Sequence, residues 1–202
     1  MTDKTRTLPG TGLILAGGSG TRMGFDKTSL PWNGTTLLVH LEKIVSSIMS
    51  ETLIVGLRGG RPTGISTQTV CIAEPRKLGP LGGLRHGLSA MHHPKALVIA
   101  CDMPFISTEA IEALWKESEG FEATLPETDD GLHPLFGIYT RSCLPHVEIK
   151  LEQGERKFIS FFDLVKTQFI NTSGRRDFWA RTLVNLNSPE EFKRALDAEK
   201  GT

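Results

Sequence analysis

Two basic side chains, Arg22 and Lys27, lie in a glycine-rich segment near the start of the chain. Residues 15–27 read LAGGSGTRMGFDK and follow a short apolar run, which predicts a buried strand that ends at a glycine turn. Glycines let a backbone approach a ligand closely and point several N–H groups into one concavity, which suits phosphate oxygens. The two cations would add the formal positive charge that backbone dipoles lack. The segment therefore predicts a phosphate-binding loop after the first strand.

The spacing of this loop excludes two common phosphate-binding motifs. A P-loop requires glycine directly before its Lys-Thr pair, but here Lys27 and Thr28 follow Asp26. The dinucleotide-binding fingerprint requires glycine at its sixth place, and counted from Gly18 that place is Met23. A glycine-rich turn alone is weak evidence, because loops after strands are often glycine-rich for steric reasons.

A carboxylate follows a second apolar run. Asp102 comes directly after residues 96–101, which read as a buried strand. Because the carboxyl ends of parallel strands line the ligand crevice of an open α/β sheet, we expect Asp102 at a substrate site. One carboxylate together with substrate phosphates is how proteins usually hold Mg²⁺. The alternative is that Asp102 only starts the turn into the next helix, as aspartates often do.

Short apolar runs alternate with helix-periodic segments, which predicts an α/β fold: a three-layer structure with a mostly parallel sheet and helices on both faces. We expect strands at residues 13–15, 53–55, 70–72, 96–101 and 183–186, and a hairpin over 124–139. We expect helices at 35–49, 80–91, 107–119, 142–153 and 157–165, and a capping-box helix from Ser188. No linker or repeat divides the sequence, so we expect one domain over 1–202, with 1–10 flexible.

Composition limits the partners of the protein. The 23 Lys and Arg residues equal the 23 Asp and Glu residues, so no net field draws the chain to nucleic acid or to an anionic membrane. The apolar runs are too short to span a bilayer, and the first 12 residues lack the apolar stretch of a signal peptide. The three cysteines are widely separated and show no CxxC spacing, which favours reduced thiols. We therefore expect a cytoplasmic protein.

Taken together, residues 15–27 resemble the nucleotide-binding signature of the molybdenum cofactor guanylyltransferases, the MobA-type members of the nucleotidyltransferase superfamily. The resemblance runs from residue 13 to about residue 192 and implies a Rossmann-like nucleotidyltransferase fold that uses GTP, Mg²⁺ and molybdopterin. It implies nucleotide contacts from Leu15, Ala16, Gly17, Gly18, Lys27, Glu74, Gly79 and Asp102. The resemblance further implies that Lys27, Arg22 and Asp102 are catalytic and that Asp102 holds the metal.

The same resemblance suggests candidates for the second-substrate site, namely His133, Arg156, Lys157, Asn185 and Asn187. His133 matches a family position on the face that meets the pterin, and Arg156 with Lys157 matches a basic turn. The two asparagines match the asparagine pair that precedes the last helix of the family. The residues alone also allow simpler roles: a structural hairpin histidine, solvated charges, and an asparagine that enters a turn.

Two positions depart from the family pattern. Glu74 stands where the family has aspartate, upstream of the Gly-Pro-Leu turn at 79–81 that approaches the base. Glu74 is therefore either a guanine contact or a solvated loop acid. Gly56 stands where some members carry a polar asparagine, so no side chain from that position reaches the nucleotide.

The resemblance implies transfer of GMP from GTP to the terminal phosphate of molybdopterin, with release of pyrophosphate. The residues agree, because a phosphate monoester is already ionised near pH 7 and needs no general base. Catalysis then rests on positioning and charge neutralisation. The alternatives are a nucleotidyltransferase of the same fold that uses CTP or another phosphate acceptor, and a GTP-binding cofactor-delivery factor. Contacts with molybdoenzymes or other cofactor-biosynthesis proteins would be transient.

Overall fold

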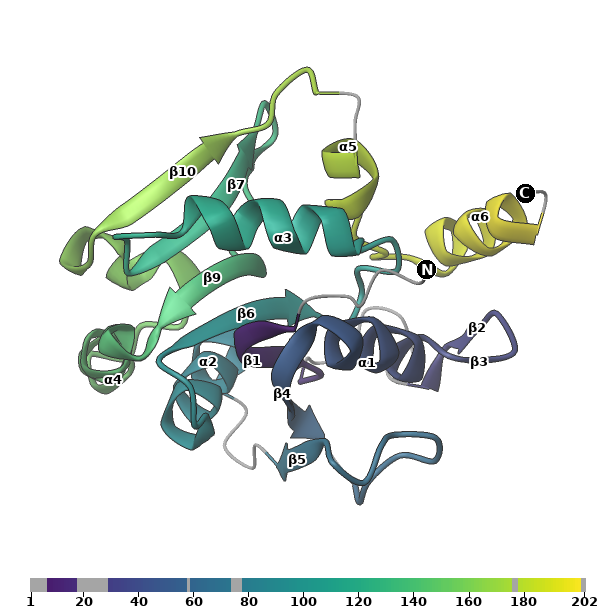
Figure 1. Cartoon of the computed structure of the whole chain (residues 1–202), viewed down its shortest axis with the longest axis horizontal. Helices are drawn as coiled ribbons and strands as arrows, with labels where there is room; N and C mark the ends of the chain where they lie inside the picture. The colour runs from purple at the N-terminus through teal and green to yellow at the C-terminus, as the bar shows by residue number, and fades with distance from the viewer. Residues whose placement is uncertain (1–6, 18–28, 58, 74–77, 176–177, 201–202) are drawn as a thin grey trace.

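An eight-stranded sheet forms the centre of the molecule (Figure 1). The computed structural model describes residues 7–17, 29–57, 59–73, 78–175 and 178–200. The strand order is β10-β7-β9-β6-β1-β4-β5, and β8 pairs with β7 off this path. The strands are β1 (Leu8–Leu15), β4 (Met49–Leu57), β5 (Val70–Ala73), β6 (Lys95–Ala100), β7 (Ala123–Thr128), β8 (Gly131–Leu132), β9 (Phe136–Thr140) and β10 (Thr167–Asn171). β1 runs parallel to β4 and β6, whereas β9 is antiparallel to both of its neighbours. The predicted mostly parallel sheet is confirmed.

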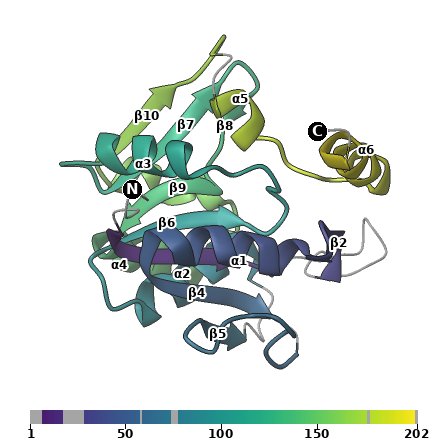
Figure 2. The same ribbon diagram turned by 45° about the vertical axis from the view of Figure 1, so that its right-hand side comes forward.

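Helices cover both faces of this sheet, as Figures 1 and 2 show with α1 and α3 on one side and α2 on the other. One core contains side chains of α1 (Leu37–Ile48), α3 (Thr108–Glu117), α5 (Phe178–Thr182) and α6 (Pro189–Lys200). The other contains side chains of α2 (Gly79–Ala90), α4 (Leu144–Glu152) and the 3-10 helices Arg141–Cys143 and Phe158–Leu164. The predicted three-layer α/β architecture is therefore confirmed.

Side-chain capping sets where several helices begin. The hydroxyl groups of Thr36 and Ser107 accept backbone N–H groups at the start of α1 and α3. At α6, Ser188 Oγ accepts the N–H of Glu191 at 3.2 Å, and the Glu191 carboxylate accepts the N–H of Asn187 at 2.7 Å. The first bond is that of the predicted capping box, but the carboxylate reaches the N–H one residue before the N-cap Ser188 instead of that of Ser188 itself. The two bonds fix the backbone that carries Asn187 to the first turn of α6.

Helix α2 packs closely on β1 because the buried face of the helix carries glycines. A Cβ on Gly87 would lie 2.2 Å from Leu13 Cδ2, and one on Gly83 would lie 3.1 Å from Leu15 Cδ2. Glycine inside a helix lowers stability by about 1 kcal/mol relative to alanine. The close packing of α2 on β1 outweighs this loss of helix propensity. The contact at Gly83 holds the first half of α2 beside the end of β1.

The structure differs from the sequence-based expectations at three places. Residues 8–10, expected to be flexible, form the first part of β1. Residues 183–186, expected to be a strand, join no sheet; the N–H of Leu186 instead donates to the C=O of Asp102 at 2.9 Å. The helix expected over 157–165 is a 3-10 helix that starts one residue later.

Three elements have no counterpart in the expectations from the sequence: a small hairpin, strand β10 and helix α5. The hairpin pairs β2 (Pro31–Trp32) with β3 (Thr35–Thr36). Its turn residues Asn33 and Gly34 have φ angles of 43° and 77°. An Asn-Gly pair between two strands is a strong signal for such a turn, so the sequence did contain the information for the hairpin.

Candidate active site

The candidate site lies where β1 and β6 end side by side. After β1 the chain adds β4 and β5 on one side of β1. It then crosses back, and β6 pairs with the other side of β1. In open α/β sheets, ligands bind outside the carboxyl ends of the strands at such a reversal. The N–H of Cys101 donates to the C=O of Leu15 at 3.1 Å, and the N–H of Ala16 donates to the C=O of Val55 at 2.8 Å. The chain segments after β1, β4 and β6 therefore start from one fixed edge.

Two glycines cross at this edge with almost no space between their backbones. Gly56 has a φ of +95°, and a Cβ at this residue would lie 2.5 Å from both N and Cα of Gly17. A Cβ on Gly17 would in turn lie 3.2 Å from Gly56 Cα. This crossing needs glycine at residue 56, because a side chain there would strain the backbone and displace Gly17, where the predicted phosphate-binding loop begins. The absence of a polar residue at 56 thus has a physical reason.

The predicted nucleotide contacts fall into two groups. Leu15, Ala16 and Gly17 lie at the end of β1, Gly79 begins α2, and Asp102 follows β6, all at the same edge of the sheet. The other three predicted contacts, Gly18, Lys27 and Glu74, lie outside the described residues, as does the predicted catalytic residue Arg22, so all four stay predictions.

The beginning of α2 provides an environment that favours anions. Gly79 has a φ of +71°, and no atom of the described residues would lie within 4 Å of a Cβ there. Pro80 occupies the first turn, where its missing N–H is not needed. The N–H groups of a helix start have no partner within the helix and carry partial positive charge, which favours phosphate oxygens.

A cavity of about 230 Å³ opens beside Asp102. One part of its lining is polar and consists of Asp102, Asn185 and Asn187. The other part consists of Met103 and residues 132–136, which include His133. The structure therefore gathers four predicted site residues, Asp102, His133, Asn185 and Asn187, from three separate segments. The apolar lining residues were missed, because their side chains carry no chemical signal in the sequence.

Asp102 has the surroundings of a single-carboxylate metal site. The residue is half-buried in the turn after β6, and its Oδ1 atom is fully buried. Its C=O binds the N–H of Leu186, which stands between the two cavity asparagines. Carboxylate and amide oxygens suit a hard cation such as Mg²⁺. Among the described residues no three His, Cys, Asp or Glu side chains gather as a metal site, so a cation here would need phosphate or water ligands as well.

His133 is held on both its backbone and its ring. Its N–H donates to the C=O of Pro126 at 2.9 Å, and its C=O accepts the N–H of Phe136 at 3.1 Å. Its ring atom Nε2 lies 3.0 Å from Thr128 Oγ1. Burial lowers the pKa of His133 below its ordinary value, against a smaller opposite effect of the Asp130 carboxylate. The imidazole is therefore neutral at pH 7.

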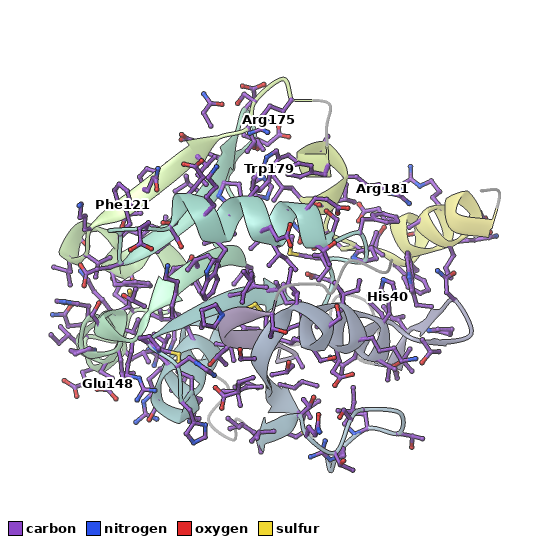
Figure 3. All side chains as sticks on the ribbon, in the orientation of Figure 1. His40, Phe121, Glu148, Arg175, Trp179 and Arg181 are labelled. Atoms are coloured by element: carbon purple, nitrogen blue, oxygen red, sulfur yellow. The ribbon has the colours of Figure 1, made fainter. Side chains whose placement is uncertain are left out.

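An aromatic contact supports the cavity wall from behind. The Phe136 ring packs edge-on against Trp179 of α5, with the ring centroids 6.2 Å apart. The Arg175 guanidinium lies 5.6 Å from the centre of the Trp179 ring, and Figure 3 shows both beside α5. Since α5 leads directly to Asn185, this packing fixes the apolar wall and the asparagine segment relative to one another.

The basic pair at 156–157 does not reach the cavity. Arg156 and Lys157 are exposed in the turn after α4, and neither lines the cavity. Arg156 Nη1 instead donates to the C=O of Leu151 at 3.3 Å and to that of Glu155 at 2.8 Å. Their contact with the second substrate stays a prediction.

The sheet brings the end of β1 and the carboxylate after β6 to one reversal point. This is the architecture of the α/β nucleotidyltransferases, and the protein is an enzyme of this class. The chain belongs to the family of MobA-like NTP transferase domains, whose sequence profile matches residues 12–167. The family and fold expected from the sequence are confirmed.

Relatives of this family match nearly the whole chain. A probable molybdenum cofactor guanylyltransferase of Pelotomaculum thermopropionicum is 30% identical over 192 residues, which cover 93% of this chain and 92% of the relative. A protein of Synechococcus elongatus with the same description is 32% identical over 190 residues, covering 90% and 95%. The crystal structure of molybdopterin-guanine dinucleotide biosynthesis protein A from Archaeoglobus fulgidus has a TM-score of 0.80 at 26% identity, covering 95% of this chain and 100% of that one.

Proposed function

We propose that this protein transfers GMP from GTP to the terminal phosphate of molybdopterin, forming molybdopterin guanine dinucleotide and pyrophosphate. The observation that carries the proposal is the cavity beside Asp102, which joins a carboxylate and two amides to an apolar wall. The two amides can donate hydrogen bonds to phosphate oxygens, and a cation held on the carboxylate would attract them. The apolar part with His133 suits a flat heterocycle. The description of the relatives as guanylyltransferases supports the same reaction.

The reaction joins two polyanions. An oxygen of the acceptor phosphate attacks the α-phosphorus of GTP, the bond to the β-phosphate breaks, and pyrophosphate leaves with the electron pair. The acceptor phosphate is already ionised, so the site has no need of a side chain that removes a proton. The work of the protein is to align the two substrates and to neutralise their charge.

The residues divide this work between them. Lys27 and Arg22 hold the triphosphate of GTP together with the backbone of residues 15–18 and the start of α2. Asp102 holds Mg²⁺, which when bound neutralises phosphate charge. Asn185 and Asn187 orient the acceptor phosphate, and Glu74 with Gly79 meets the guanine edge.

We further propose that the chain is one domain that works in the cytoplasm, with transient contacts to molybdoenzymes or other cofactor-biosynthesis proteins. The two cores on opposite faces of one continuous sheet support a single domain. Cys71, Cys101 and Cys143 form no disulfide with one another, which agrees with a reducing compartment. No helix in the described part of the chain has the length and apolar character to cross a bilayer.

Incubation with GTP, Mg²⁺ and molybdopterin tests the reaction directly. The expected products are pyrophosphate and a dinucleotide that mass spectrometry identifies as guanine-containing. Tight GTP binding with no product from any pterin acceptor would favour the cofactor-delivery alternative instead.

We expect GTP to be preferred over CTP by at least about tenfold in kcat/KM. Guanine offers donors at N1 and N2 that cytosine lacks, and one or two hydrogen bonds to them supply a preference of this size. Pyrophosphate release at equal concentrations of the two nucleotides measures it. Equal or better turnover with CTP would assign the protein to the cytidylyl-transferring alternative.

A further inference from the structure

The hairpin between β7 and β8 joins Thr128 to the cavity histidine. Thr128 is the last residue of β7, Gly131 begins β8, and His133 follows β8. Thr128 Oγ1 lies 3.3 Å from the C=O of Gly131, 3.3 Å from the N–H of Asp130 and 3.0 Å from His133 Nε2. One hydroxyl group thus meets three partners inside a single turn.

The chemistry of these partners decides where the protons lie. A hydroxyl has one proton to donate and two lone pairs that accept. The carbonyl of Gly131 can only accept, so it takes the Thr128 proton. The N–H of Asp130 can only donate, so it occupies one lone pair. One lone pair of Oγ1 is then left for the contact with Nε2. All three contacts are hydrogen bonds only if Nε2 carries a proton.

We propose that Thr128 is a positioning residue that fixes the His133 ring with Nε2 protonated and Nδ1 as an acceptor for an N–H or NH₂ group of the second substrate. In a neutral imidazole one nitrogen donates and the other accepts, so a bond from Nε2–H to Thr128 leaves the lone pair on Nδ1. His133 lines the cavity, and burial favours its neutral form. A pterin carries ring N–H and exocyclic NH₂ donors. This role of His133 rests on the proposed function, whereas the bond to Thr128 does not.

Nitrogen NMR of the free protein tests the bond without any substrate. In ¹⁵N-labelled protein at pH 7.5, we expect His133 to show a protonated Nε2, an unprotonated Nδ1 and a directly observable Nε2–H proton. The His133→Asn variant identifies these signals among the six histidines by removing them. A proton on Nδ1 in the wild-type protein would overturn the proposal, because Thr128 would then be the donor.

Three variants separate the hydroxyl from the shape of the residue. Thr128→Val should lose the Nε2–H signal through exchange with water, and Thr128→Ser should keep it. Thr124→Val is the matched control, since Thr124 lies on the same strand and its buried Oγ1 makes no hydrogen bond to the described residues. An Nε2–H signal that persists in Thr128→Val would contradict the assigned bond.

Kinetics test the consequence for the second substrate. Thr128→Val should raise the KM for molybdopterin by about three- to tenfold, the value of one hydrogen bond, and leave the KM for GTP unchanged. Thr128→Ser should restore the KM for molybdopterin, and Thr124→Val should match the wild type. A parallel rise in both KM values would overturn the positioning role. If the protein makes no dinucleotide at all, the proposed function fails, while the nitrogen spectrum still decides how Thr128 and His133 are joined.

Discussion

Replacement of Asp102 by alanine should lower turnover by at least about a hundredfold and leave the fold intact. Loss of one preorganised electrostatic contact typically reduces a rate by about 10²–10³-fold. Asp102 is the carboxylate of the cavity, and the neighbouring asparagines carry no charge to replace it. Pyrophosphate release with saturating GTP, Mg²⁺ and acceptor measures the effect, and circular dichroism checks the fold.

Two further variants make this result specific to the charge. Asp102→Asn keeps the size of the side chain and should lose activity to a similar extent, because an amide binds a hard cation more weakly. Asp197→Ala removes an exposed carboxylate on α6 and should behave as the wild type. Normal Mg²⁺-dependent activity in Asp102→Ala would refute the metal assignment.

Gly56→Ala should destabilise the protein by about 3 kcal/mol and weaken GTP binding. A left-handed backbone costs alanine about 1–2 kcal/mol, and forcing an atom into occupied space adds about 1–3 kcal/mol. Here the added methyl group would lie 2.5 Å from backbone atoms of Gly17, which cannot move aside as a flexible side chain would. In a chain of this length the melting temperature should fall by about 6–12 °C. Thermal unfolding and GTP titration measure the two effects.

Gly120→Ala separates the two causes. Gly120 also has a positive φ, +76°, but no atom in the described part of the chain would lie within 4 Å of a Cβ there. Only the conformational cost of about 1–2 kcal/mol should remain, with GTP affinity unchanged. If both variants lose the same stability, the crossing of Gly17 and Gly56 does not constrain the loop.

The sequence predicted the sheet well where strands are buried on both faces. The runs that became β1, β4 and β6 are continuous and apolar, as central parallel strands require, and the helices between them have clear periodicity. Residues 183–186 show why the rest could not be predicted in this way. Their apolar pattern fits a strand, but a strand also needs a partner, and here the bonding partner is a loop.

The candidate site was predictable only where residues carry chemistry. Asp102 stood out by its type and its place after a strand, whereas His133 and the two asparagines were candidates through the family resemblance, and the structure brings all four together. Phe136 also lines the cavity, but in the sequence it is an ordinary strand residue. The contribution of Thr128 depends on a hairpin that places its hydroxyl beside a ring several residues later, and spacing alone does not reveal that geometry.

The bond from Leu186 to Asp102 bears on how acceptor specificity could be exchanged between relatives. It ties the C-terminal segment to the turn after β6, and the Glu191 carboxylate ties Asn187 of that segment to α6. The family profile ends at residue 167, before both asparagines, so a swap limited to the profile region would mix two unmatched halves of one pocket. A working hybrid would therefore need the turn after β6 and the segment that carries Asn185 and Asn187 from the same relative.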